Sequence, residues 1–142
     1  IEYNVRMGDP ECQTIIPRLK TDLFEIILSC CNGSLKNIIL EWDNKFSLSI
    51  VLCSKGYPDK YKKNVKINGL ENLTHSKNQF IFHAGTIRKN NEILATGGRV
   101  LNFTSLSENF YLCQKESLKL INNLDWNNGF FRKDIGFKVI KK

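Results

Sequence analysis

The stretch FSLSIVLC (residues 46–53) alternates between two kinds of side chain. One series is apolar and consists of Phe46, Leu48, Ile50 and Leu52. The residues between them are smaller or more polar, except Val51, which is apolar. Successive side chains of a β-strand point to opposite faces, so this alternation predicts a strand with one face in a hydrophobic core. Residues 54–58, SKGYP, then predict a loop, because glycine and proline interrupt regular structure.

Other segments on both sides of this strand carry comparable signals. Alternation and turn residues predict further strands at 1–7, 65–67, 79–84, 98–104 and 130–140, and a hairpin over 86–95 that turns at 89–91. Helical spacing predicts helices over 22–31, started by Asp22 with Glu25, and over 106–123, started by a Ser105–Glu108 capping box. We therefore expect an α+β fold with a mostly antiparallel sheet, open or curled into a partial barrel, and two main helices.

Composition narrows the class of protein. The chain has 142 residues, the size of one ordinary domain, and a net charge of +7 that favours anionic partners. The basic residues are scattered, which is also typical of a solvated surface. No apolar run is long enough for a membrane span and no targeting segment is visible, so we expect no membrane partner. The absence of an initiator Met suggests a fragment that lacks its N-terminal part.

Five cysteines are present: Cys12, Cys30, Cys31, Cys53 and Cys113. Their number is odd, and no pair has the spacing of a metal site. We interpret them as small apolar core residues of a protein in a reducing cytoplasm.

The first predicted strand places Glu2, Asn4 and Arg6 on one face, with alternate residues about 7 Å apart. Carboxylate and amide oxygens are ligands that Mg²⁺ accepts, and a guanidinium can bind a phosphate or carboxylate through two hydrogen bonds. The pattern is compatible with the edge of a nucleotide–metal site. The spacing by itself is also that of an ordinary polar strand face.

Seven blocks of sequence together resemble the phosphoribosylamine–glycine ligases (glycinamide ribonucleotide synthetases) of the ATP-grasp family. They occur in the family's order and cover nearly the whole chain: EYNVRMGDPE (2–11), PRLK (17–20), EWD (41–43), SKGYP (54–58), FHAGT (82–86), GGRVL (97–101) and RKDIG (132–136). Met7 and Cys12 depart from the residues usual in the family, but neither change removes a ligand or a charge.

The resemblance implies that residues 1–18 end an ATP-grasp domain and that residues 19–142 form the ligase's C-terminal domain. It implies a cytoplasmic enzyme of purine biosynthesis that uses ATP to join glycine to 5-phosphoribosylamine through glycyl phosphate. By similarity, Glu2 and Asn4 bind Mg²⁺ or Mn²⁺, and Arg6 holds the acyl phosphate or stabilises its charge. The partner would be the missing N-terminal part of the same protein, without which we expect the fragment to be inactive.

Further polar residues are candidates for substrate binding. Lys55, Gly56 and Tyr57 could cover a substrate phosphate, or could form an ordinary surface turn. Arg99 could contact a ligand or pair with a carboxylate, and Asp9 could orient Arg6 or cap the next helix. His83 could be a general base but is more typical of a structural, hydrogen-bonded histidine, and Arg132 with Asp134 suggests a structural ion pair.

Two other functions compete with the ligase. One is a basic α+β module that binds nucleic acid; it would explain the charge but not the ordered blocks, and the chain lacks the interleaved aromatic and basic residues of such modules. The other is a structural subunit that complements a separate ATP-binding chain. We expect a ligase and no nucleic-acid partner.

Overall fold

Strands β1 (Phe46–Ser54) and β6 (Arg99–Ser107) form the centre of the fold. The computed structural model describes residues 4–140. In it, β6 lies between β1 and β3 (Gln79–His83), and β1 also pairs with the short strand β7 (Gly129–Phe130), all antiparallel. The resulting sheet has the order β3-β6-β1-β7. The strand predicted from residues 46–53 is therefore confirmed as a central element.

A second, three-stranded sheet has the order β2-β5-β4, formed by β2 (Val65–Lys66), β4 (Thr86–Lys89) and β5 (Glu92–Ala95). The β4–β5 hairpin turns at Asn90 and Asn91, both with positive φ. Asparagine tolerates this left-handed conformation better than most residues, so the predicted hairpin is confirmed together with its physical cause. The short helix η3 (Leu70–Asn72) follows β2. Both sheets are open, so the antiparallel α+β prediction holds without closure into a barrel.

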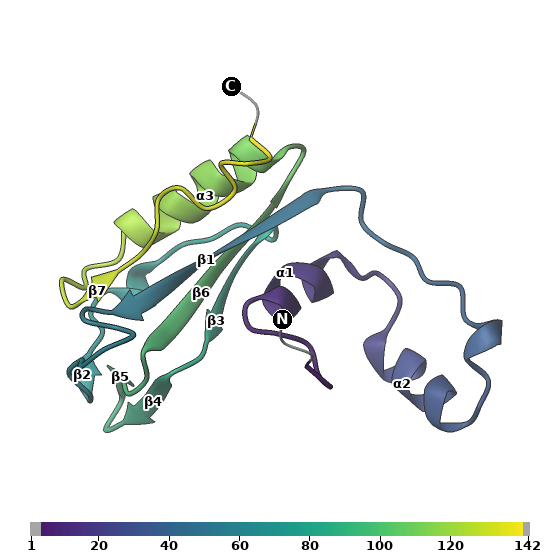
Figure 1. Ribbon diagram of the computed structural model, residues 1–142, viewed down its shortest axis with the longest axis horizontal. Helices are drawn as coiled ribbons and strands as arrows, with labels where there is room; N and C mark the ends of the chain where they lie inside the picture. Colours follow the sequence, from purple (N-terminus) through teal and green to yellow (C-terminus); the bar gives the residue numbers. More distant parts are fainter. Residues whose placement is uncertain (1–3, 141–142) are drawn as a thin grey trace.

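Helix α3 (Phe110–Asn122) covers one face of the four-stranded sheet (Figure 1). Its Cys113, Leu120 and Ile121 pack against the apolar series of β1. The core also contains these buried residues: Ile67, Ala95, Val100, Leu101, Phe103 and Trp126. The helix begins where the Asn109 side chain accepts a hydrogen bond from the Leu112 amide.

The opposite face of the same sheet includes buried polar side chains. Ser49, Asn102 and Thr104 are at most 8% exposed, and Thr104 donates a hydrogen bond to Ser49 Oγ at 2.9 Å. Helix α1 (Glu11–Ile15), continued by η1 (Ile16–Arg18), lies over this face, on the other side of the sheet from α3 (Figure 1). The N-terminal segment therefore covers a surface that needs hydrogen-bond partners.

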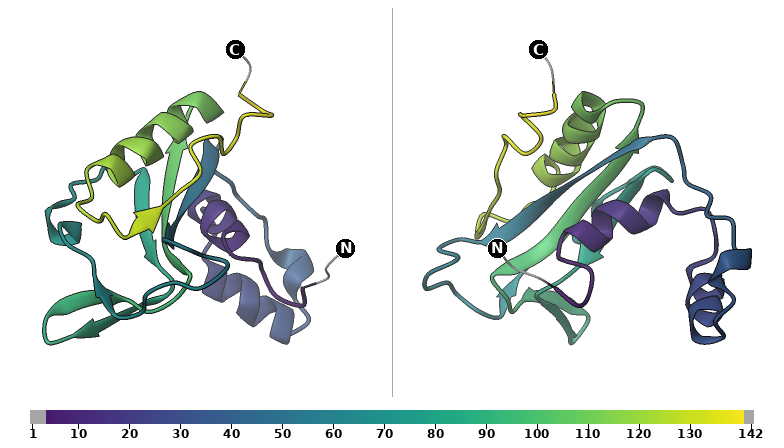
Figure 2. Two further views of the ribbon diagram at one scale, coloured as in Figure 1. Left: turned by 60° about the vertical axis from the view of Figure 1, so that its left-hand side comes forward. Right: turned by 45° about the vertical axis from the view of Figure 1, so that its right-hand side comes forward.

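Helix α2 (Leu23–Cys31) and η2 (Leu35–Asn37) stand apart from both sheets, as Figure 1 and the right view of Figure 2 show. Helix α2 begins at Asp22, whose side chain accepts a hydrogen bond from the Phe24 amide, as the sequence predicted. No residue of α2 is buried, so the interpretation of its Cys30 and Cys31 as core residues is wrong.

Several predicted boundaries are corrected. Residues 4–7 form a bend and no strand, while residues 1–3 lie outside the described part; within residues 4–140 no neighbouring strand pairs with this segment. The predicted helix start at Ser105 is wrong because β6 continues to Ser107, which pairs with Phe46. The predicted strand over 130–140 is wrong beyond Phe130.

The C-terminal segment turns instead of extending. Gly136 has a φ of +87°, and the amides of Phe137, Val139 and Ile140 bond to carbonyls three or four residues earlier. Gln114 of α3 donates to the Ile135 carbonyl at 2.7 Å, which fastens this segment to the helix. Local turns and one side chain of α3 therefore provide backbone hydrogen bonds that a neighbouring strand would otherwise provide.

Candidate functional site

Asp9 fastens the segment predicted to carry the metal ligands to the central sheet. Its Oδ1 accepts hydrogen bonds from Gln13 Nε2 at 2.9 Å and from Asn102 Nδ2 at 3.3 Å. Arg99 donates from Nη1 to the Asp9 main-chain oxygen at 2.8 Å, and its Nε lies 3.7 Å from Asp9 Oδ2. The contacts of Asp9 with Arg99 and Asn102 join residues 90 and 93 positions apart and hold the start of α1 against β6.

The two alternatives for Arg99 and Asp9 are resolved in part by this network. Arg99 pairs with a carboxylate, while 46% of its side chain stays exposed. Asp9 bonds to Arg99, Gln13 and Asn102 and not to Arg6, and α1 has no side-chain cap. A role for either residue in substrate binding stays a prediction.

Arg6 lines a hollow of about 440 Å³ between the N-terminal segment and the end of β3. Met7, Asp9 and His83 line the same hollow. The Arg6 guanidinium donates to the Met7 carbonyl at 2.9 Å, and among residues 4–140 it takes part in no salt bridge. A guanidinium at the edge of a hollow, without an acidic partner among those residues, can accept an anionic ligand there.

His83 has a hydrogen-bond partner, as expected for a structural histidine. Its Nδ1 lies 2.9 Å from Thr86 Oγ1, a hydrogen bond that bridges the turn between β3 and β4. The side chain also borders the Arg6 hollow. The structure therefore gives His83 a hydrogen-bond partner and places it beside the predicted catalytic residue.

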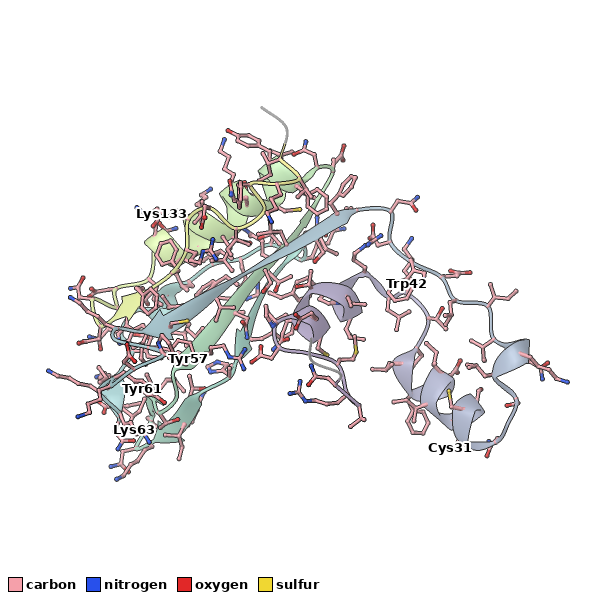
Figure 3. All side chains as sticks on the ribbon, in the orientation of Figure 1. Cys31, Trp42, Tyr57, Tyr61, Lys63 and Lys133 are labelled. Atoms are coloured by element: carbon pink, nitrogen blue, oxygen red, sulfur yellow. The ribbon has the colours of Figure 1, made fainter. Side chains whose placement is uncertain are left out.

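The loop after β1 contributes residues to two different places. The Tyr57 ring lies against Gly98, where a Cβ atom would overlap it, so this residue of the predicted loop sits next to Arg99. Gly56 has a φ of +104° and faces the Lys60 carbonyl, a conformation and a space that favour glycine. Lys55 instead lines a separate hollow of about 240 Å³ together with Lys62, Trp126 and Asn128. In Figure 3, the labelled Tyr57 lies beside the four-stranded sheet and far from α2.

An apolar hollow of about 460 Å³ adjoins this loop. Pro10, Cys53, Tyr57 and Phe131 are among its lining residues. Burial raises the pKa of the Cys53 thiol, which keeps it protonated and poorly nucleophilic at neutral pH. Cys53 is therefore a packing residue, like the buried Cys113, whereas Cys30 and Cys31 are exposed and contradict the prediction that all five cysteines are core residues.

Arg132 and Asp134 form the ion pair that the sequence suggested. Two guanidinium nitrogens donate to the two carboxylate oxygens at 3.0 and 2.7 Å. The hydrogen bonds from Arg132 lower the pKa of the Asp134 carboxyl, and both side chains are more than half exposed.

Sequence reasoning missed Gln13 and Asn102. Asn102 is fully buried within β6, so its amide needs partners inside the protein. A polar amide inside a predicted strand was the available signal for Asn102. No pattern distinguished Gln13, because its role depends on where Asp9 lies in space.

The predicted metal ligands supply suitable chemistry but not a complete site. Glu2 lies outside the described residues, and Asn4 is exposed. Within residues 4–140, no three His, Cys, Asp or Glu side chains gather in a way that could hold a metal ion. A carboxylate and an amide oxygen fit Mg²⁺, which usually takes only one or two protein ligands beside water and phosphate oxygens.

No helix among residues 4–140 is long and apolar enough to cross a membrane.

Comparisons with known proteins place this chain in one family. The family described as "Phosphoribosylglycinamide synthetase, C domain" matches residues 47–138. The "Bifunctional purine biosynthetic protein purD" of Dictyostelium discoideum is 47% identical over 99% of this chain, which covers 17% of that protein. The phosphoribosylamine–glycine ligase of Agrobacterium fabrum is 44% identical over the whole chain, which covers 33% of that enzyme.

A solved structure of a ligase is also similar to this chain. The crystal structure of the phosphoribosylamine–glycine ligase from Thermotoga maritima superposes with a TM-score of 0.69 and 28% identity, over 95% of this chain and 32% of that one. The α+β architecture of this chain is thus similar to that of part of a solved ligase structure. The chain belongs to the phosphoribosylglycinamide synthetase C-domain family, and it spans about a third or less of the length of these relatives.

Proposed function

We propose that this chain supplies the C-terminal part of an ATP-dependent carbon–nitrogen ligase that makes glycinamide ribonucleotide in the purine (IMP) pathway. ATP would phosphorylate the glycine carboxylate and release ADP. The amine of 5-phosphoribosylamine would then attack the glycyl phosphate carbon, and phosphate would leave. The observation that supports this proposal most is that a ligase aligns over all 142 residues at 44% identity, including the segment from Glu2 to Arg6.

The residues of this chain would bind and orient the anionic reactants. Glu2 and Asn4 would hold Mg²⁺ or Mn²⁺, which neutralises phosphate charge during phosphoryl transfer. Arg6, at the edge of its hollow, would hold the acyl phosphate through charge-assisted hydrogen bonds. The Asp9–Arg99 contacts would keep this segment in position relative to the sheet. Such positioning supplies much of the catalysis in phosphoryl transfer.

The substrate phosphate would lie near the loop after β1. Lys55 and Lys62 line one hollow and add positive charge, while the Tyr57 ring lies against Gly98, the residue that precedes Arg99. We propose a cytoplasmic setting, which suits five cysteines in the free thiol form. This chain alone would be inactive, because it holds only part of the proposed metal site.

The test requires the coding sequence extended upstream of Ile1 to its first start codon. We expect the extended protein to release ADP only when glycine and 5-phosphoribosylamine are both present. Glu2→Ala should reduce this release to background without changing the melting temperature. Glu71→Ala, an exposed glutamate on η3, is the matched control and should keep full activity.

Two results would count against the proposal. An extended protein that folds but shows no release of ADP dependent on both substrates would refute the ligase function. Full activity in Glu2→Ala would refute the metal-binding role while leaving the ligase function intact.

A further inference from the structure

Residues 55–66, called the lysine loop here, carry much of the protein's positive charge. This segment follows β1, includes β2, and contains five lysines and one aspartate, a net charge of +4 where the whole chain has +7. Among residues 4–140, only one of these five lysines lies within salt-bridge distance of a carboxylate: Lys66 pairs with Glu92 at 2.7 Å. Unpaired cations that gather in one segment raise the local positive potential and attract anions.

Two lysines of this loop, Lys55 and Lys62, line a hollow of about 240 Å³. The other residues that line it are Ser54, Val65, Trp126 and Asn128. No acidic side chain is among them, so nothing in the lining neutralises the two ammonium groups. Lysine binds phosphate as a point charge and forms strong, charge-assisted hydrogen bonds with its oxygens. The lining therefore suits an anion with several oxygen acceptors.

The main chain beside the hollow is held by contacts that leave the lysine side chains free to bind. The Lys55 amide donates to the Asn128 carbonyl at 2.8 Å, and the Ser54 amide donates to the Gly98 carbonyl at 2.8 Å. The Ser54 hydroxyl donates to the Gly97 carbonyl, also at 2.8 Å. These bonds join the end of β1 to the segments that precede β6 and β7. The wall of the hollow is thus fixed, while the side chains of both lysines are exposed.

Trp126 adds a buried hydrogen-bond donor that lacks a partner. Its side chain is 8% exposed, and its Nε1 has no hydrogen-bond partner within residues 4–140. A Cβ atom on Gly129 would lie 2.6 Å from Trp126 Cε3, so the benzene edge of the ring packs at Gly129 and Nε1 lies on the other edge. An unpaired buried donor costs free energy. An anionic oxygen in the hollow would stabilise it after a small movement of the side chains that cover it.

The volume of the hollow limits the ligand to a small group. Pockets for drug-sized ligands measure about 300–1,000 Å³. This hollow, at about 240 Å³, suits a phosphate group and is too small for a whole nucleotide. It shares no lining residue with the hollow of Arg6, so it is a second place where the chain can hold an anion.

We propose that Lys55, Lys62 and the indole N–H of Trp126 bind a phosphate group in this hollow, either that of a small phosphate monoester or inorganic phosphate itself. The inference deepens the proposed function, in which 5-phosphoribosylamine carries such a group and phosphate is a product. It rests on that function for the source of the phosphate group. The binding step needs only the residues that line the hollow.

The two tryptophans of the chain allow a direct test by NMR. The ¹H–¹⁵N spectrum of the 142-residue chain contains one indole N–H signal from each, and Trp42→Phe assigns them. When inorganic phosphate is added at constant ionic strength, the Trp126 signal should shift and saturate, while the signal of Trp42 stays in place. Ribose 5-phosphate should shift the Trp126 signal in the same way, and ribose should not. Calorimetry with inorganic phosphate repeats the measurement on the upstream-extended protein.

Two lysines of the same loop provide the variant and its control. Lys60 and Lys62 are both exposed, but only Lys62 lines the hollow. Lys62→Gln should raise the dissociation constant for phosphate roughly five- to tenfold, because it removes a charge-assisted hydrogen bond. Lys60→Gln removes the same charge from the same loop and should raise it less than about twofold, because more distant exposed charges are screened.

Steady-state rates of the extended protein identify the source of the phosphate group. If the substrate's phosphate binds here, Lys62→Gln raises KM for 5-phosphoribosylamine by a similar factor and leaves KM for glycine unchanged. If the product binds here, both KM values stay unchanged and inhibition by added phosphate weakens. Either result supports the site and names its ligand.

Three results would overturn the inference while leaving the ligase function intact, provided that the extended protein still releases ADP. The first is the absence of a saturable shift of the Trp126 signal. The second is an equal effect of Lys60→Gln and Lys62→Gln, which would show a diffuse basic surface. The third is tighter binding of single-stranded DNA than of phosphate, weakened by both variants. Saturable phosphate binding in an extended protein that releases no ADP would instead refute only the proposed function.

Discussion

Replacing Asp9 with Ala removes the acceptor that ties the N-terminal segment to β6. Asp9→Ala deletes two side-chain hydrogen bonds, from Gln13 and Asn102, and an ion pair with Arg99 at 3.7 Å. The bond from Arg99 to the Asp9 main-chain oxygen can remain, because it does not use the carboxylate. The variant therefore isolates the side-chain part of the anchor.

The expected loss in the free energy of unfolding follows from how far Asp9 and Asn102 are buried. A hydrogen bond to a charged group contributes about 1.5–3 kcal/mol, but Asp9 is 31% exposed, so the lower end applies. The partly exposed ion pair adds at most about 1 kcal/mol. Asn102 is fully buried and its Nδ2 would lose the Asp9 acceptor, a cost of about 1–3 kcal/mol that relaxation or water can reduce. We expect a net loss of roughly 2 kcal/mol.

Urea unfolding of the 142-residue chain measures this loss. Asp134→Ala is the matched control, because Asp134 also pairs with an arginine but on the open surface, and its effect should be clearly smaller. Exchange of the Cys12 amide, which bonds to the Gly8 carbonyl, should accelerate in Asp9→Ala only. A loss below about 0.5 kcal/mol for Asp9→Ala, or equal losses for both variants, would refute the proposed anchor.

Two further predictions concern a helix cap and an exposed ion pair. Asn109→Ala removes the side-chain acceptor at the start of α3 and should destabilise the chain by about 1 kcal/mol in urea unfolding; no change would mean that the cap contributes nothing. Arg132 lowers the pKa of Asp134, so the pair's contribution is fully present above the unfolded pKa of about 3.9 and is lost as pH falls through the lower, folded value. Urea midpoints measured from pH 6 to pH 2 should therefore fall less steeply for Asp134→Asn, and identical slopes would contradict the shift.

Local signals in the sequence predicted the elements whose conformation is decided locally. The alternation of residues 46–53 predicted β1, and Asn90–Asn91 predicted the β4–β5 turn because asparagine accepts positive φ. Asp22 predicted the start of α2 because its side chain can accept a hydrogen bond from the first turn.

Predictions failed where a distant partner decides the conformation. Ser105 and Glu108 resemble a capping box, yet β6 extends to Ser107 because Phe46 pairs with it across the sheet. The apolar C-terminal segment resembles a strand, yet it turns at Gly136 and bonds to Gln114 of α3. In both places tertiary contacts outweigh a weak local preference.

The candidate site shows the same division between features that local sequence predicts and features that distant partners decide. The residue types at Glu2, Asn4 and Arg6, together with the ordered blocks, pointed to a ligase, and the comparisons confirm the family. The metal ligation and the substrate contacts remain predictions. The pairing of Asp9 with Arg99 could not be predicted as a contact, because it joins positions far apart in the chain.

The sequence by itself determined the family, the alternating strands and the places where the chain can turn, since these depend on residue type and short-range spacing. Only the tertiary structure decided that Asp9 anchors the N-terminal segment to β6 and that Asn102 is its buried partner. Only the tertiary structure showed that the apolar side chains of α2 meet no core within residues 4–140. Periodicity reports which side chains share a face, whereas burial depends on which surface that face meets.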